Sequence, residues 1–127
     1  MSVPTHLKYS RDHFWIRLED EVAVIGLTDT GITEWGMILY IDLPEMDMRV
    51  DQGEYLGSVE NVDGEHDLRS PLSGRVTAVN RLIERAALLL HESPYDKGWL
   101  YAIQWSRESE LEQLLDAEAY KLHTSLE

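Results

Sequence analysis

Short runs of strand-favouring residues, each closed by turn residues, constrain this chain more than any other feature. Bulky and β-branched residues fill 14–18 and 22–27, and three acidic residues separate the two runs. Runs this short, bounded by Gly, Asp or Pro, are typical of antiparallel strands joined by tight turns. We therefore expect residues 14–27 to form a β-hairpin.

The same pattern continues along the chain. Further strands are predicted over residues 37–43, 55–62, 75–79 and 99–105. The Asp63-Gly64 pair between two such runs predicts a tight hairpin turn, because both residues tolerate positive φ. The strand-rich pattern predicts a mainly β (α+β) fold.

Helix signals are fewer. Short polar residues at 28–30 and a stop signal at Gly36 predict a short helix over about 31–35. Residues 81–90 contain strong helix formers and no proline, so we expect one continuous helix there. A capping box that starts at Ser109 predicts a C-terminal helix over about 109–122.

Composition excludes several classes of protein. The 127 residues suit a single domain over 1–127, with a core over about 8–120. The absence of cysteine removes disulfides, cysteine-ligated zinc and thiol nucleophiles. A net charge of −13 argues against nucleic acid and against anionic membranes as partners. No membrane-spanning run or secretory signal is visible, so we expect a cytoplasmic protein.

The densest polar segment is 60–67, with the sequence E-N-V-D-G-E-H-D. Carboxylates and an imidazole could bind a divalent metal or serve an enzyme, but the spacing does not fit an EF-hand loop. The alternative is an acidic, solvated hairpin tip. We expect no metal site and no catalytic residues, so the segment is interpreted as a surface.

Taken in order, several segments resemble the H protein of the glycine cleavage system. The resemblance covers about residues 8–120 with almost no gaps. It is carried by K-Y-S-R-D-H-F-W at 8–15, A-V-I-G-L-T-D at 23–29, I-D-L-P at 41–44, G-S-V-E-N-V at 57–62, P-L-S-G at 71–74, S-P-Y at 93–95, G-W-L at 98–100 and L-L-D-A-E-A-Y at 114–120.

This resemblance implies a barrel-sandwich hybrid, which is a lipoyl/biotinyl-domain-like β-sandwich with short helices and a C-terminal helix. H proteins carry lipoate on one lysine at a hairpin tip, within the motif E-S-V-K-A. The lipoyl arm takes an aminomethyl group from the decarboxylating subunit to the aminomethyltransferase. Such a protein is a shuttle and not an enzyme.

The carrier lysine is missing from this chain. The motif reads E-N-V-D-G here, and the alignment from Gly57 to Gly74 needs no gap, so Asp63 occupies the carrier position. A carboxylate cannot form an amide with lipoate, and the three lysines are at positions 8, 97 and 121. We therefore expect no lipoyl attachment and no cofactor.

The leading hypothesis is a non-catalytic binding or regulatory module that docks on a protein partner, such as a glycine-cleavage subunit or a lipoate-handling enzyme. Its partner surface is predicted to comprise Glu60, Asn61, Asp63, Gly64, Glu65, His66 and Asp67. One alternative is an ordinary lipoyl carrier, for which Lys97 is the available amine near a predicted loop. Metal-binding or enzymatic use of the acidic tip, and a decayed paralogue with a merely solvated tip, are the others.

Overall fold

A computed structural model describes residues 3–126 of the chain. Its strands are β1 (Lys8–Tyr9), β2 (Phe14–Glu19), β3 (Val22–Leu27), β4 (Tyr40–Asp42), β5 (Arg49–Val50), β6 (Tyr55–Asn61), β7 (Gly64–Arg69), β8 (Gly74–Val79) and β9 (Tyr101–Trp105). Its helices are α1 (Asp29–Trp35), α2 (Leu82–Arg85), α3 (Leu89–Glu92), the 3₁₀ helix η1 (Glu108–Gln113) and α4 (Ala117–Ser125).

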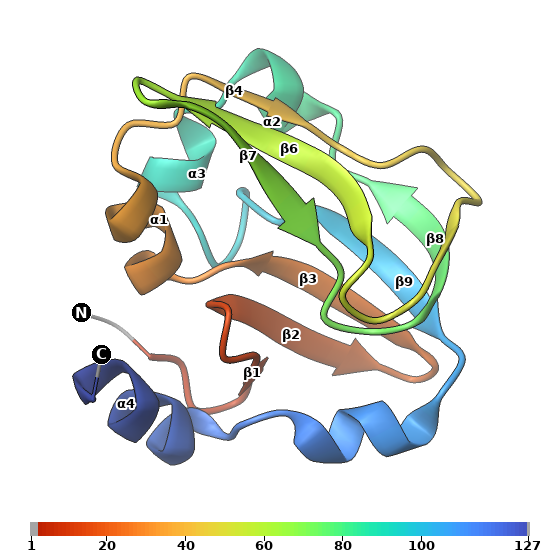
Figure 1. The fold of residues 1–127 in the computed structure, drawn as a ribbon. Helices are drawn as coiled ribbons and strands as arrows, with labels where there is room; N and C mark the ends of the chain where they lie inside the picture. The colour runs from red at the N-terminus through yellow and green to blue at the C-terminus, as the bar shows by residue number, and fades with distance from the viewer. Residues whose placement is uncertain (1–2, 127) are drawn as a thin grey trace.

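The strands form two antiparallel sheets. The larger has the order β1-β2-β3-β9-β8-β5, and the smaller has the order β4-β6-β7. Figure 1 shows the smaller sheet above the larger one, with α4 below the larger sheet. The predicted mainly β sandwich with short helices is confirmed, and its two sheets stay separate instead of closing into a barrel.

The main core contains side chains from both sheets. Ile16 and Ile25, which are cross-strand neighbours on β2 and β3, are fully buried in it together with Val59 of β6. A second cluster contains Trp15 and Val24, which alternate with those core residues along the same strands. Alternate residues therefore enter different clusters, as the period of two along a strand requires.

The first hairpin and the first helix agree with the sequence predictions. β2 pairs with β3 over all six residues of each strand. α1 follows Thr28, whose hydroxyl accepts a hydrogen bond of 3.1 Å from the Gly31 N–H. Gly36 ends this helix with φ of 70°, a conformation that glycine adopts at little cost.

Residues 81–90 do not form the predicted continuous helix. α2 and α3 replace it, and the chain leaves helical geometry at Ala86, whose φ and ψ are −140° and 64°. The break changes the direction of the chain, and both Ile83 before it and Leu90 after it are fully buried in the main core. Tertiary packing overrides local helix propensity here.

The predicted C-terminal helix over residues 109–122 is wrong at its start. η1 occupies the first part of that range and has no side-chain cap, so the Ser109 capping box does not form. The chain then becomes extended, because Leu115 exchanges backbone hydrogen bonds of 2.7 and 2.8 Å with Tyr9. α4 begins only after Asp116, whose side chain caps it.

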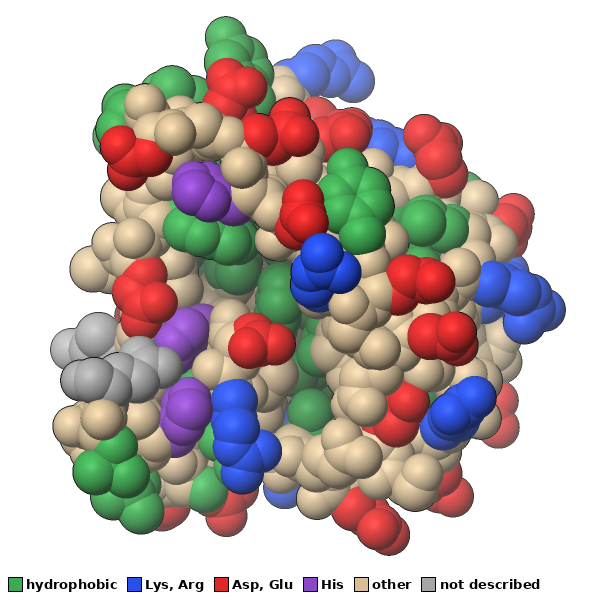
Figure 2. All heavy atoms as spheres, in the orientation of Figure 1, with side chains coloured by type: hydrophobic (Ala, Val, Ile, Leu, Met, Phe, Trp, Pro, Cys, Tyr) green, Lys and Arg blue, Asp and Glu red, His purple; other side chains and the backbone are tan. Residues whose placement is uncertain are grey.

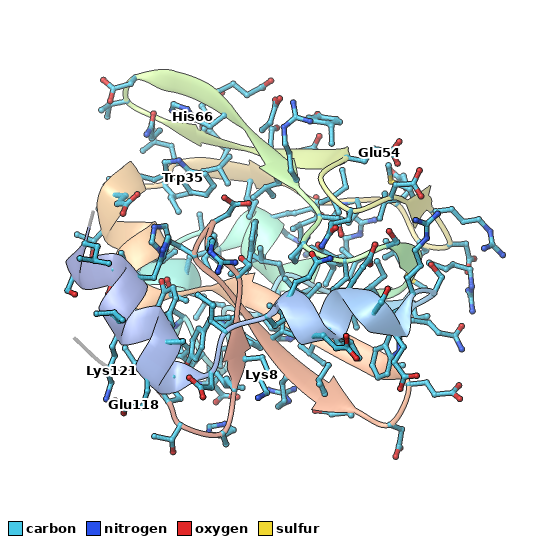
Figure 3. The ribbon with its side chains drawn as sticks, turned by 60° about the horizontal axis from the view of Figure 1, so that its bottom comes forward. Lys8, Trp35, Glu54, His66, Glu118 and Lys121 are labelled. Carbon is cyan, nitrogen blue, oxygen red and sulfur yellow. The ribbon has the colours of Figure 1, made fainter. Side chains whose placement is uncertain are left out.

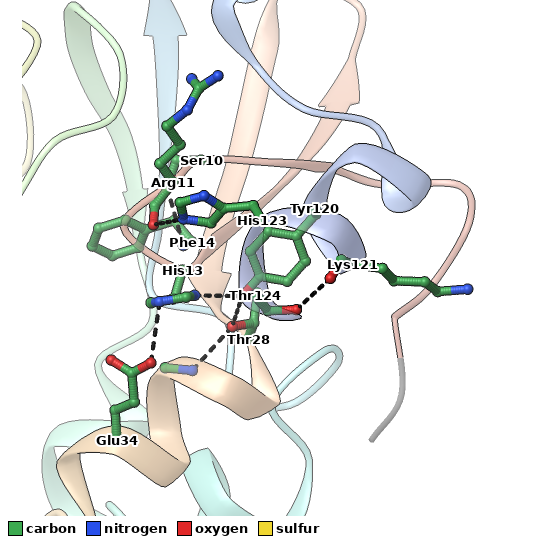
Figure 4. A network of polar contacts seen from close by, with 11 residues as sticks. Ser10, Arg11, His13, Phe14, Thr28, Glu34, Tyr120, Lys121, His123 and Thr124 are labelled. Atoms are coloured by element: carbon green, nitrogen blue, oxygen red, sulfur yellow. Dashed lines mark hydrogen bonds and ion pairs between the residues drawn. The ribbon is translucent and has the colours of Figure 1, made fainter. Parts of the chain in front are cut away.

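A buried polar network attaches α4 to the rest of the molecule (Figure 4). The Tyr120 hydroxyl lies 2.7 Å from Nδ1 of His13 and 2.7 Å from Oγ1 of Thr28. Nε2 of His13 lies 3.2 Å from the Glu34 carboxylate. The Tyr120 ring also stacks on Tyr9 at a centroid distance of 4.6 Å. The network therefore ties together α4, α1 and the start of β2.

The burial of three tyrosines predicts that the fold is lost at high pH. Burial raises the pKa of Tyr9 and Tyr101 above the ordinary value, and it raises the pKa of Tyr95 to about 12. In the unfolded chain these phenols ionise at about pH 10. The stability that they contribute is therefore complete below about pH 10 and is lost as the pH rises through their folded-state pKa values.

Above about pH 10 we expect the circular dichroism to change together with the part of the tyrosinate absorbance that comes from Tyr9, Tyr95 and Tyr101. Tyr101→Phe removes one of the three ionisations and should move the transition to higher pH. Complete tyrosinate formation near pH 10 with an intact fold would contradict this account.

The described surface is strongly acidic. Acidic side chains are spread over the face in Figure 2, where basic ones are fewer. No helix within residues 3–126 has the length and apolar character that crossing a bilayer requires.

Candidate functional site

The hairpin of β6 and β7 holds the segment that the sequence singled out. Asn61 pairs with Gly64, so the two-residue turn consists of Val62 and Asp63. Only Gly64 has positive φ here, at 128°. The prediction of a hairpin at this position is confirmed, but the prediction that Asp63 and Gly64 are its two central residues is wrong. Gly64 instead begins β7, so Asp63 lies at the very tip.

The side chain of Asn61 fixes the conformation of the tip through hydrogen bonds. Its side chain is 6% exposed, and its Oδ1 accepts a 2.9 Å hydrogen bond from the Asp63 N–H. Its Nδ2 donates a 2.9 Å bond to the Trp35 carbonyl at the end of α1. Nε2 of His66 lies 3.1 Å from the same Oδ1, which is acceptor only, so this nitrogen is the donor. Asn61 therefore supports the surface from below and exposes little of its own side chain.

Trp35 is a member of the site that the sequence did not reveal. Its ring stacks on that of His66, with centroids 6.2 Å apart and planes 21° apart. Figure 3 shows the two side chains facing each other between α1 and the hairpin. His66, which is half-buried, therefore packs against α1 with part of its surface left outside.

The exposed part of the hairpin is acidic. Glu60, Asp63, Glu65 and Asp67 are all exposed, and no lysine or arginine lies between 60 and 67. Glu60 is the cross-strand partner of Glu65. Like charges at directly opposite positions destabilise a sheet, by up to about 1 kcal/mol. This pair therefore reduces the stability of the hairpin while raising its negative potential.

These acids do not converge on a metal. Within residues 3–126, no group of three or more His, Asp or Glu side chains is arranged to hold an ion. Asp67 instead pairs with Arg69 at 3.0 Å. The described geometry therefore gives the metal-site alternative no support.

The three lysines lie outside the hairpin of β6 and β7. Figure 3 shows Lys8 and Lys121 at the opposite end of the view from His66. Lys8 belongs to β1, and Lys121 belongs to α4, where it pairs with Glu118 at 3.5 Å. Lys97 lies in the segment between α3 and β9. The described hairpin thus presents a carboxylate, and no amine, at its tip.

The tip should depend measurably on Asn61. Asn61→Ala leaves the Trp35 carbonyl and the Asp63 N–H without their partners, so we expect a loss of about 1–3 kcal/mol in the free energy of unfolding. Denaturant titration measures this loss, and faster amide exchange at Asp63 locates it.

Glu60→Gln is the matched control, because it lies next to Asn61 but removes only a repulsive charge. Its stability should equal or slightly exceed that of the wild type. An Asn61→Ala variant that matches the wild type in both stability and Asp63 exchange would refute the supporting role of Asn61.

Comparison with known proteins agrees with the fold and the motif order. Residues 7–126 match the family model described as "Glycine cleavage H-protein". Glycine cleavage system H proteins from two strains of Staphylococcus epidermidis are 41% and 40% identical over 120 residues, covering 94% of this chain and 95% of each relative.

A solved structure gives the same result in three dimensions. The crystal structure of a glycine cleavage system H protein from Mycobacterium marinum is 29% identical to this chain. It superimposes with a TM-score of 0.86, covering 97% of this chain and 99% of that one. The chain therefore belongs to the glycine cleavage H-protein family.

Proposed function

We propose that this chain is an H-protein-like module that cannot carry lipoate and that acts by docking on a protein partner. One observation supports the proposal: a carboxylate, Asp63, lies at the hairpin tip, where the motif resembling E-S-V-K-A would have its lysine. The proposal assigns the chain no catalytic residue and no cofactor.

The chemistry of attachment supports this proposal. Lipoate is held through an amide, which requires an amine on the protein, and an aspartate side chain offers none. A shift in the alignment would not supply an amine, because no lysine lies between Lys8 and Lys97. Arg69 is the first lysine or arginine after the tip, and its guanidinium remains protonated and is a poor acceptor for acylation.

The charge of the tip supports docking on a basic partner. Glu60, Asp63 and Glu65 are exposed and lack ion pairs among the contacts of residues 3–126. An uncompensated acidic surface attracts a basic one and raises the rate of encounter. A glycine-cleavage subunit or a lipoate-handling enzyme is the partner class that this family's surface would meet.

Enzymatic modification tests the first half of the proposal. The purified chain is incubated with a lipoate ligase, ATP and lipoate, with a lysine-bearing H protein as the positive control, and both are weighed by intact-mass spectrometry. We expect no mass gain for this chain. A gain of one lipoyl group would refute the proposal.

Charge reversal tests the second half. Asp63→Arg and Glu65→Arg should each weaken capture of the native partner, and high salt should weaken capture by the wild type. Glu118→Arg is the matched control, since Figure 3 shows Glu118 far from the hairpin on α4. Equal loss in all three variants would show only a net-charge effect and would contradict docking at the tip.

A further inference from the structure

The edges of the two sheets differ in how open they are. β1 and β5 have two residues each, and β1 is covered by its bridge to Leu115. β4 has three residues and is followed closely by Pro44, which cannot donate a backbone hydrogen bond. β7 has six residues and pairs only with β6 in the described structure. It is therefore the one long open edge among residues 3–126.

The register shows which backbone groups face outward from β7. The Glu60 carbonyl accepts a 2.8 Å hydrogen bond from the Leu39 N–H, so the backbone of Glu60 faces β4. Its cross-strand partner Glu65 is then a non-hydrogen-bonded partner, whose own N–H and C=O point away from β6. The same holds two residues later for Asp67. No backbone partner for these groups occurs within residues 3–126.

The side chains at these two positions determine what can pair with the edge. Glu65 and Asp67 are exposed and acidic; Asp67 already pairs with Arg69 at 3.0 Å, whereas Glu65 has no ion pair among residues 3–126. A strand with Lys or Arg at the position facing Glu65 would gain a favourable cross-strand pair. Figure 2 shows hydrophobic side chains set back in a hollow below the place where Figure 1 draws β7.

We propose that β7 accepts an extended basic segment of the partner protein as a fourth strand of the smaller sheet. Main-chain hydrogen bonds to Glu65 and Asp67 supply the pairing, and the Glu65 carboxylate, which has no ion pair among residues 3–126, selects Lys or Arg. This inference rests on the proposed docking function and names the partner element that the hairpin would hold.

A synthetic peptide tests strand addition directly. The probe is a six-residue peptide in which lysine alternates with valine, added at millimolar concentration to the ¹⁵N-labelled full chain. We expect amide exchange at Glu65 and Asp67 to slow by about tenfold when the site is nine-tenths occupied. An analogue with alternate backbone nitrogens methylated has the same charge and should give no protection. Equal effects of the two peptides, or no slowing with either, would overturn the proposal.

Two variants of one residue separate the backbone from the charge. Asp67→Pro removes an outward-facing N–H and leaves the ladder with β6 intact, as proline permits on an edge strand. Asp67→Asn loses the same charge but keeps that N–H. We expect the proline variant to lose peptide protection at Glu65 and the asparagine variant to keep most of it. Equal behaviour of the two variants would contradict strand addition.

Capture of the native partner distinguishes this inference from the docking proposal. If Asp63→Arg loses the partner and Asp67→Pro keeps it, strand addition is wrong and docking at the tip stands. If neither variant loses the partner, docking by the hairpin is itself wrong. Loss in both, with the folded state checked by circular dichroism, agrees with the two proposals together.

Discussion

Replacing Asp63 by lysine is expected to turn a chain that a lipoate ligase leaves unmodified into one that gains a single lipoyl group. Asp63 is not among the residues with positive φ; in this turn region only Gly64 is. Lysine therefore fits position 63 without backbone strain. The hairpin register keeps this side chain at the exposed tip, where an enzyme can reach it.

Asp63→Lys has two matched controls: one has the same positive charge but no amine that can be acylated, and the other has the amine at the preceding position. Asp63→Arg brings the same positive charge without an acylable amine, and Val62→Lys places the amine one residue earlier, at a side chain that is 79% exposed. We expect neither to be modified as Asp63→Lys is. Intact mass and peptide mapping give the answer. Modification of the wild type, or equal modification of Val62→Lys and Asp63→Lys, would contradict the assignment of position 63.

Replacing Gly74 by alanine is expected to destabilise the fold strongly, because the added methyl would meet the backbone of a neighbouring strand. A Cβ at position 74 would lie 2.1 Å from the Gln104 backbone oxygen. That oxygen belongs to β9, which pairs with β8 inside the larger sheet, so neither strand can move alone. We expect a loss of about 3 kcal/mol, measured by denaturant titration.

Gly53→Ala is the matched control for this substitution. Gly53 has φ of 84°, but nothing lies within 4 Å of an added Cβ. The expected cost is that of backbone strain alone, about 1 kcal/mol. Equal denaturation midpoints for the two variants would show that the close approach of β8 to β9 is not what restricts position 74.

Local patterns predicted the first hairpin and the first helix but not the two later helices. The alternation in 14–27 depends only on neighbouring residues, so it predicted the hairpin, which is confirmed. The helix expected over 81–90 does not form, because Ile83 and Leu90 are both buried in the main core, whose other side chains come mostly from strands elsewhere in the chain. The C-terminal helix starts late because Leu115 pairs with Tyr9, more than a hundred residues earlier in the chain.

At the site, too, local sequence patterns predicted only part of what the structure shows. The composition and the resemblance were enough to single out Asp63, since the motif that resembles E-S-V-K-A reads E-N-V-D-G here. The bond from Asn61 to the Trp35 carbonyl and the stacking of Trp35 on His66 depend on folding across long separations. One local signal was available: asparagine two residues before a turn N–H commonly accepts its hydrogen bond, as Asn61 does for Asp63.

The most direct test is the intact mass of the chain purified from the cells that naturally produce it. Those cells supply their own lipoate enzymes, partners and conditions, so the measurement does not depend on a chosen ligase. The account predicts one species with the unmodified mass of the sequence. A species heavier by one lipoyl group, mapped to Lys8, Lys97 or Lys121, would contradict it.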